Sequence, residues 1–149
     1  MKLRPLCEAD LAALSPWFPR VAADLACDAL AGDGALRRAV GQDDILAAVE
    51  HGPAGILSYE IDAPDRDSAR IRLLAIDPSR RRLGIGSRAA LTLEKHLAGK
   101  VARIYVTVPA KLGLAFYFWL RLGYQPLTQS QWPAPPETPP AAWMVRPLD

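Results

Sequence analysis

Residues 76–87 read IDPSRRRLGIGS, with three consecutive arginines beside two glycines. An apolar segment precedes this stretch, and a segment with helical periodicity follows it. The first N–H groups of a helix have no partner within the helix, and the aligned peptide dipoles leave about half a positive charge there. Because Gly84 and Gly86 have no side chains, phosphate oxygens can approach these N–H groups, and arginines can add charge-assisted hydrogen bonds. The stretch therefore predicts a diphosphate-binding loop.

Two other phosphate-binding loops do not fit these residues. The dinucleotide fingerprint needs a third glycine, and Ala89 is the small residue nearest to that position. The mononucleotide loop needs Gly-Lys-Ser or Gly-Lys-Thr, and neither tripeptide occurs in the sequence. A flexible loop of solvated arginines without a ligand is the remaining alternative.

Periodicity and turn residues place the loop between a strand and a helix. Ile85, Ala89, Leu93 and Leu97 recur every four residues along one helical stripe, and Gly99 follows as a stop signal. The pattern predicts strands over residues 1–5, 45–50, 55–61, 71–76, 101–108, 124–128 and 142–148. It predicts helices over residues 7–14, 21–30, 35–40, 87–98 and 111–122. The expected fold is a single α/β domain of the α+β type that spans residues 1–149.

The composition fits a globular chain and argues against several kinds of partner. Half of the 149 residues are apolar, and the formal net charge of +2 is too small for general nucleic-acid binding. The longest near-apolar run, residues 112–120, is far shorter than the ~20 residues that cross a bilayer. The N-terminal segment lacks the apolar core of a signal peptide, and the two cysteines lack metal-ligand spacing. We therefore expect a soluble, cytoplasmic protein without a metal, a membrane or a nucleic-acid partner.

Two segments resemble motifs of a known family. Residues 76–87 resemble the acetyl-CoA-binding motif of the GNAT superfamily of N-acetyltransferases. In that motif a strand ends in an x-Pro turn, and a loop of the form Arg/Gln-x-x-Gly-x-Gly/Ala opens a helix; Arg81, Gly84 and Gly86 fill the defining positions. Residues 115–124, AFYFWLRLGY, look like the family's A-x-x-F-Y-x-x-x-G-F/Y segment. The resemblance covers residues 55–128 well and the N-terminal part by element order only.

The resemblance implies a fold, a cofactor and a reaction. The fold is a mixed, mostly antiparallel sheet of about seven strands, flanked by helices and splayed between the fourth and fifth strands. The cofactor is acetyl-CoA, whose pantetheine arm pairs with backbone near Ala75 and Ile76. Its diphosphate lies on the loop formed by Arg81, Arg82, Leu83, Gly84, Ile85, Gly86 and Ser87. The reaction is acetyl transfer to a primary amine of a small molecule or protein, by direct attack on the thioester, and a homodimer is in keeping with the family.

The chain departs from the family at the position that protonates the leaving thiolate. The tyrosine that usually donates this proton aligns with Trp119, whose indole N–H is far too weak an acid. Trp119 is therefore expected at the cofactor, and Tyr117 becomes the proton donor if the alignment slips by two residues. The two side chains are about 200° apart around a helix, so one cannot simply replace the other. Packing is the alternative role for this aromatic segment.

The remaining candidate residues are a general base, a ligand for water and a proline-rich segment. Glu60, on the strand before the apolar one, is the candidate base, and a solvent-facing strand residue is the alternative. Thr107 is a candidate ligand for water. The proline-rich residues 133–140 are expected to form a stiff loop between hairpin partners, or else a ligand for another protein. Two functions stay open: a working acetyltransferase, or an acyl-CoA-binding sensor or interaction module with little activity.

Overall fold

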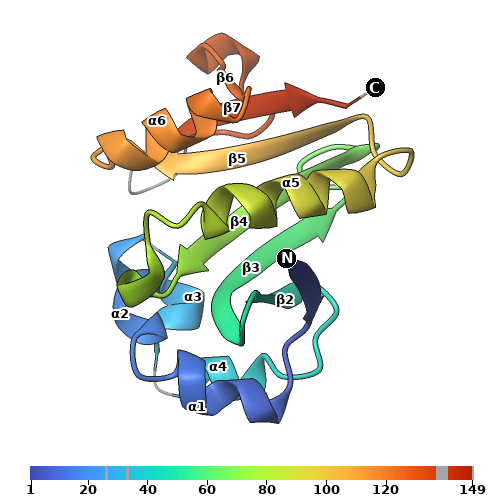
Figure 1. Ribbon diagram of the computed structural model, residues 1–149. Coiled ribbons are helices and arrows are strands. Elements are labelled where there is room, and N and C mark those ends of the chain that lie inside the picture. Colours follow the sequence, from blue (N-terminus) through green and yellow to red (C-terminus); the bar gives the residue numbers. More distant parts are fainter. Residues whose placement is uncertain (26, 33, 137–140, 149) are drawn as a thin grey trace. The chain divides into compact units, whose positions relative to one another are not determined.

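The computed structural model describes residues 1–25, 27–32, 34–136 and 141–148 (Figure 1). The strands are β1 Lys2–Pro5, β2 Ile45–Val49, β3 Pro53–Ile61, β4 Ser68–Ile76, β5 Arg103–Pro109, β6 Gln125–Pro126 and β7 Ala141–Pro147. Within the described residues they form a seven-stranded sheet in the order β1-β2-β3-β4-β5-β7-β6. β4 and β5 pair parallel, whereas β1–β2, β2–β3, β5–β7 and β6–β7 pair antiparallel. The mixed, mostly antiparallel sheet expected from the sequence is confirmed.

The parallel pair β4–β5 splays, as expected. Its ladder joins Ser68–Ile71 of β4 to Arg103–Val106 of β5. β4 continues to Ile76 and β5 to Pro109 beyond this ladder. Residues 72–76 of β4 are therefore not paired with β5 in this ladder, and they lead into the glycine-rich loop.

Contacts between Cα atoms divide the chain into two compact units. Unit 1 comprises Met1–Tyr59 and Arg72–His96, and unit 2 comprises Glu60–Ile71 and Leu97–Asp149. β3, β4 and the helix after the glycine-rich loop each contribute residues to both units. That the chain is a single domain stays a prediction.

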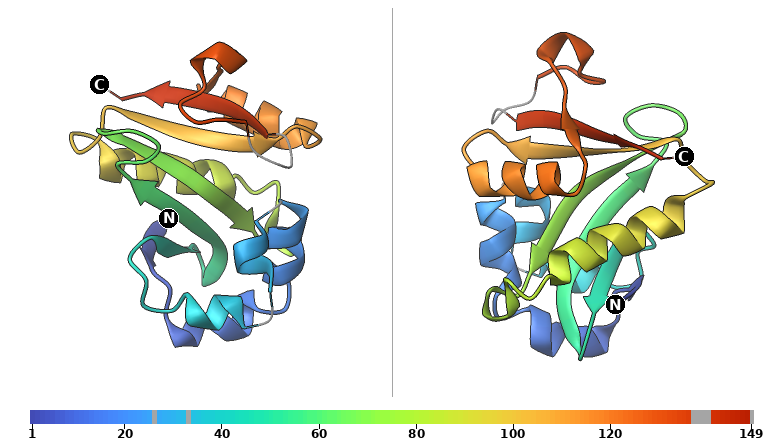
Figure 2. Two further views of the ribbon diagram at one scale, coloured as in Figure 1. Left: turned by 180° about the vertical axis from the view of Figure 1, so that it is seen from behind. Right: turned by 45° about the horizontal axis from the view of Figure 1, so that its top comes forward.

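In unit 1, short helices pack against the strands around one apolar core (Figure 2). The helices are α1 Leu11–Leu14, α2 Phe18–Asp24, α3 Asp28–Ala31 and α4 Ala35–Arg38. Leu14 and Phe18 of the helices are fully buried and share this core with Ile56, Leu73 and Ala75 of the strands. This burial of apolar side chains is the main favourable term in the folding of the unit.

The N-terminal helices are shorter than predicted. The segment 7–14 forms a 3-10 turn, Glu8–Asp10, followed by α1. The segment 21–30 is divided between α2 and α3. α2 begins three residues earlier than predicted, because a proline lies in its first turn, where the missing N–H is tolerated. It ends early because Cys27 N–H donates back to Ala22 O at 2.8 Å and closes the helix.

The helix after the glycine-rich loop is α5, Ile85–Leu97, which lies along β3 and β4 in Figures 1 and 2. The predicted stripe is confirmed, since Ile85, Ala89, Leu93 and Leu97 are each at most 2% exposed. Gly99 follows the helix with a φ of +80°, a conformation that glycine adopts without strain. α5 begins two residues before the predicted start at residue 87.

In unit 2, β5 and β7 pair along their whole lengths, and α6, Gly113–Arg121, lies beside them (Figure 2). β6 is shorter than the predicted strand 124–128 at both ends. Tyr124 N–H donates to Trp119 O at 3.1 Å and thereby closes α6. Thr128 N–H donates to Gln131 Oε1 at 3.0 Å and opens a 3-10 turn, Gln129–Gln131. The proline-rich segment then leads to β7, the antiparallel neighbour of β6, although its residues 137–140 lie outside the described residues.

Candidate functional site

At the end of β4, some backbone C=O and N–H groups point toward β3 and others point away from it. Asp77 N–H donates to Ala54 O at 2.8 Å. A Cβ placed on Gly55 would lie 2.6 Å from Ala75 O, so this carbonyl faces β3. Because the C=O and N–H of one peptide group point to opposite edges of a strand, the Ile76 N–H points away from β3. This N–H therefore lies on the edge of β4 where the resemblance implies the pantetheine arm.

A side-chain-stabilised turn ends β4 immediately before the glycine-rich loop. Asp77 Oδ1 accepts hydrogen bonds from Ser79 N at 2.9 Å and from Ser79 Oγ at 2.8 Å. The 3-10 turn Pro78–Arg80 follows, with the proline in its first turn. The predicted strand end at residues 77–78 is confirmed, because Pro78 has no N–H to continue a ladder.

The glycine-rich loop turns twice through left-handed backbone before α5 begins. Arg82 has a φ of +68° and Gly84 a φ of +77°. Arg88 N–H donates to Gly84 O at 3.0 Å, and this is the first i to i−4 bond of the helix. The N–H groups of Ile85, Gly86 and Ser87 precede that bond. They consequently form the electropositive helix end that the sequence predicts for an anion.

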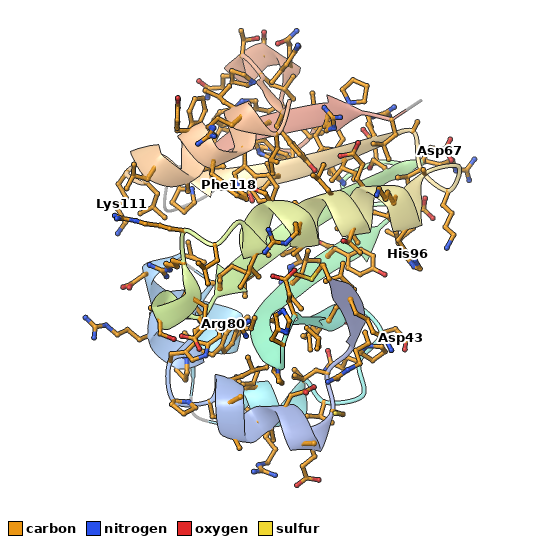
Figure 3. The ribbon with its side chains drawn as sticks, viewed as in Figure 1. Asp43, Asp67, Arg80, His96, Lys111 and Phe118 are labelled. Atoms are coloured by element: carbon orange, nitrogen blue, oxygen red, sulfur yellow. The ribbon has the colours of Figure 1, made fainter. Side chains whose placement is uncertain are left out.

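The four arginines of this region fall into two pairs. Arg80, labelled in Figure 3, donates from Nη2 to Glu50 O. Arg88 donates from Nε to Glu50 Oε1 at 2.8 Å and from Nη2 to Glu50 Oε2. Arg81 and Arg82 are exposed and form no ion pair within the part of the chain that the structure describes. The structure thus separates two arginines engaged by Glu50 from two whose guanidinium groups face solvent.

Glu50 was not predicted from the sequence. It follows β2 and lies 38 residues from Arg88 along the chain. The hydrogen bond from Arg88 lowers the pKa of the Glu50 carboxyl below its ordinary value, and the same bond raises the pKa of Arg88. No local pattern signals such a long-range pair, so it emerges only from the folded chain.

Trp119, at the family's tyrosine position, is a packed side chain in unit 2. It is 6% exposed. Its ring meets Phe118, labelled in Figure 3, edge to face at a centroid distance of 5.0 Å, and it meets Tyr124 in the same way at 5.0 Å. Edge-to-face pairs of this kind stabilise a core beyond the area that they bury. The geometry fits the packing alternative.

Tyr117 occupies another side of α6. Its side chain is 59% exposed, and the Arg121 guanidinium carbon lies 5.9 Å from the centre of its ring. α6 therefore does not bring Tyr117 and Trp119 together, as their separation of about 200° around a helix requires.

The other two candidate residues also lie in unit 2. Glu60 lies on β3 with a half-buried side chain. Thr107 lies on β5, where its Oγ1 accepts a hydrogen bond from Arg70 Nη2 at 3.1 Å. The Arg70 guanidinium lies 4.8 Å from the centre of the Trp143 ring, which fixes its orientation by a cation–π contact. The hydroxyl of Thr107 is therefore hydrogen-bonded to the Arg70 guanidinium, a contact that the sequence did not predict.

Two kinds of feature are absent from the described residues. No group of three or more His, Cys, Asp or Glu side chains there is placed to hold a metal ion. No helix among those residues combines the length and the apolarity that a membrane span requires.

Comparisons with known proteins agree with the fold. No curated protein sequence matches the chain. An acetyltransferase from Thermus thermophilus has a TM-score of 0.72 at 22% identity, over 99% of this chain and 96% of that one. The PaiA N-acetyltransferase from Thermoplasma acidophilum, solved in complex with coenzyme A, has a TM-score of 0.70 at 17% identity, over 98% of each chain. A ribosomal-protein-alanine N-acetyltransferase from Brucella melitensis has a TM-score of 0.70 at 18% identity, over 99% of this chain and all of that one.

The family model for the acetyltransferase (GNAT) family matches residues 11–124. This range includes most of the chain, with the glycine-rich loop, α5 and α6 within it. The protein belongs to the GNAT acetyltransferase family.

Proposed function

We propose that the protein is an N-acetyltransferase that moves an acetyl group from acetyl-CoA to a primary amine of a small molecule or a protein. The observation that carries this proposal is the glycine-rich loop within the segment matched by the family model. There two left-handed residues, Arg82 and Gly84, lead into the start of α5, where the N–H groups of Ile85, Gly86 and Ser87 precede the first helical bond. Such an arrangement favours the phosphates of a nucleotide-like donor.

The residues of the loop fit coenzyme A. Ala75 and Ile76 form the end of β4, and the Ile76 N–H points away from β3, as pairing with a pantetheine amide requires. We assign the diphosphate to the backbone of the loop formed by Arg81, Arg82, Leu83, Gly84, Ile85, Gly86 and Ser87. The exposed guanidinium groups of Arg81 and Arg82 add positive charge for the same phosphates. The coenzyme A complex of the similar Thermoplasma acidophilum protein supports this donor.

Acetyl-CoA supplies a thioester whose carbonyl carbon is open to attack by an amine. A lysine-like amine has a pKa of ~10.4, so its deprotonation at pH 7 costs about 4–5 kcal/mol. We assign the removal of this proton to Glu60, directly or through a water. A nitrogen–carbon bond then forms, the carbon–sulfur bond breaks, and the thiolate takes up a proton. Tyr117 is the candidate donor of this proton, because the indole N–H of Trp119 is far too weak an acid.

A second candidate function has a specific observation in its favour. Trp119 replaces the usual acid and is buried between Phe118 and Tyr124, which fits a domain selected for packing and not for proton transfer. Such a domain would bind an acyl-CoA as a sensor or interaction module. We place the acetyltransferase first, because thiolate release does not require a strong acid. The homodimer expected from the resemblance also stays a prediction.

Calorimetric titration with acetyl-CoA and with CoA, followed by thioester cleavage assays with a panel of amines, tests the proposal. We expect binding of both compounds and cleavage that rises with one class of amine. Binding without cleavage on any amine would favour the sensor, and absence of binding would refute both functions.

A substitution in the glycine-rich loop tests whether the diphosphate binds there. Gly86→Glu introduces a side chain and a negative charge at the start of α5, so we expect no measurable CoA binding. Gly32→Glu is the matched control in the same unit, because a Cβ at Gly32 meets nothing within 4 Å. Equal CoA affinity of the two variants would contradict the assignment of the diphosphate to the loop.

A further inference from the structure

Glu50 contacts two arginines that flank the glycine-rich loop and is linked through one of them to a third point. Its carboxylate accepts two hydrogen bonds from Arg88, in the first turn of α5. Its carbonyl accepts a hydrogen bond from Arg80, at the end of the 3-10 turn. The third point is indirect, since Arg88 Nη2 also donates to Leu83 O at 2.8 Å, within the loop. Glu50 therefore connects the residues before, within and after the loop to the end of β2.

The pair of Glu50 and Arg88 has the geometry of an orienting contact. Two parallel N–H donors meet the two carboxylate oxygens, and such a bidentate pair fixes direction as well as distance. The Glu50 side chain is 19% exposed, whereas Arg88 is 45% exposed. The carboxylate is thus the more buried partner of the pair, and its hydrogen bonds direct the guanidinium that also reaches Leu83 O.

Gly84 leaves the space that the Arg88 guanidinium fills. A Cβ at Gly84 would lie 2.7 Å from Arg88 Nη1. Glycine suits this position for two reasons. It adopts the left-handed φ of +77° without strain, and it has no Cβ to obstruct the close approach of the guanidinium. Glu50, Arg88 and Gly84 are therefore neighbours in one set of contacts beside the loop.

We infer that Glu50 is a positioning residue for the donor loop: it holds Arg80 and Arg88 in place so that the loop backbone is arranged before acetyl-CoA binds. This inference rests on the proposed function, because it assigns a purpose to a loop that we propose to bind the donor. A loop ordered in advance loses less conformational entropy on binding, so its ligand binds more tightly. Glu50 also balances the Arg88 charge, which leaves Arg81 and Arg82 as the cations that face solvent.

Glu50→Gln is the first test, because it keeps the size of the side chain and removes the charge that engages Arg88. We expect the Kd for CoA and the KM for acetyl-CoA to rise about ten-fold, with the kcat and the KM for the amine unchanged. We also expect faster amide hydrogen exchange in peptides that cover residues 80–88 of the ligand-free protein. Glu8→Gln is the matched control, since Glu8 forms an exposed ion pair with Arg37 in the same unit.

A double-mutant cycle separates positioning from general stability. If Glu50 acts through Arg88, its replacement has little further effect on CoA affinity in an Arg88→Gln background. Additive effects of the two changes would overturn the inference. A Glu50→Gln variant with the CoA affinity and loop exchange of Glu8→Gln would overturn it as well, while leaving the proposed function intact. Failure of the wild-type protein to bind CoA would instead refute the proposed function and, with it, the purpose assigned to Glu50.

Discussion

Asp10 offers a quantitative test of the folded structure through its titration. The residue is 1% exposed in unit 1. Its carboxylate accepts hydrogen bonds from Arg4 Nη1 at 2.8 Å and Nη2 at 2.7 Å, and from Cys7 N at 2.9 Å. The bonds from Arg4 lower the pKa of Asp10 from 3.8 to about 2, against the opposing effect of burial. Folding thus favours the ionised carboxylate.

The pKa shift of Asp10 determines how much this residue contributes to the free energy of unfolding and how that contribution depends on pH. A change from 3.8 to about 2 is nearly two units, and at 1.36 kcal/mol per unit it contributes about 2 kcal/mol to the free energy of unfolding. Because the folded pKa is the lower one, the contribution is fully present well above pH 3.8, the value of the unfolded chain. It is lost as the pH falls through this value toward the folded pKa of about 2.

Urea unfolding of the wild type and of Asp10→Asn, followed by tryptophan fluorescence from pH 7 to pH 2, measures the contribution. The variant cannot titrate at this position, so we expect it to be less stable than the wild type at pH 7. We expect the difference between the two proteins to shrink by about 2 kcal/mol toward pH 2. Glu8→Gln, which removes an exposed ion pair, should show a much smaller change. A constant difference between wild type and Asp10→Asn at all pH values would refute the assignment of the shift to Asp10.

Two further substitutions test the candidate site and the strand that leads to it. Trp119→Tyr restores the family's acid, and we expect a higher kcat at unchanged KM for acetyl-CoA; an unchanged kcat in a folded variant would mean that thiolate protonation does not limit turnover. Gly55→Ala places a Cβ 2.6 Å from Ala75 O, so we expect a loss of about 1–3 kcal/mol in the free energy of unfolding by urea. Gly32→Ala, with open space around the new Cβ, is its control, and equal stability of the two would contradict the close approach of β3 and β4.

The features that the sequence predicted well have local causes. The buried stripe of α5 follows from the spacing of Ile85, Ala89, Leu93 and Leu97, because helix geometry alone brings these residues to one face. The end of β4 follows from Pro78, which has no N–H for a ladder. The start of α5 was placed too late, because Gly84 O already accepts the first helical bond and the glycine at residue 86 is inside the helix.

The features that were not predicted depend on residues far apart in sequence. Glu50 and Arg88 are 38 residues apart, and neither carries a pattern that indicates the other. Arg70 and Thr107 are 37 residues apart and meet only because β4 and β5 pair in register. Charged side chains are compatible with many partners, so the sequence indicated an arginine-rich loop without showing which arginines are engaged.

The chemistry of the two protons explains why Trp119 is compatible with an active enzyme. An ordinary thiol has a pKa of about 8.5, so protonation of a leaving thiolate at pH 7 is worth about 2 kcal/mol. Deprotonation of a lysine-like amine costs about 4–5 kcal/mol at the same pH, so the base has the larger task. Unless Tyr117 supplies this proton, replacement of the family's tyrosine by the buried Trp119 removes the smaller contribution, and it adds aromatic packing with Phe118 and Tyr124. On this reasoning the gain from Trp119→Tyr is limited to about 30-fold in kcat, whereas loss of the proposed base at Glu60 is the more damaging change.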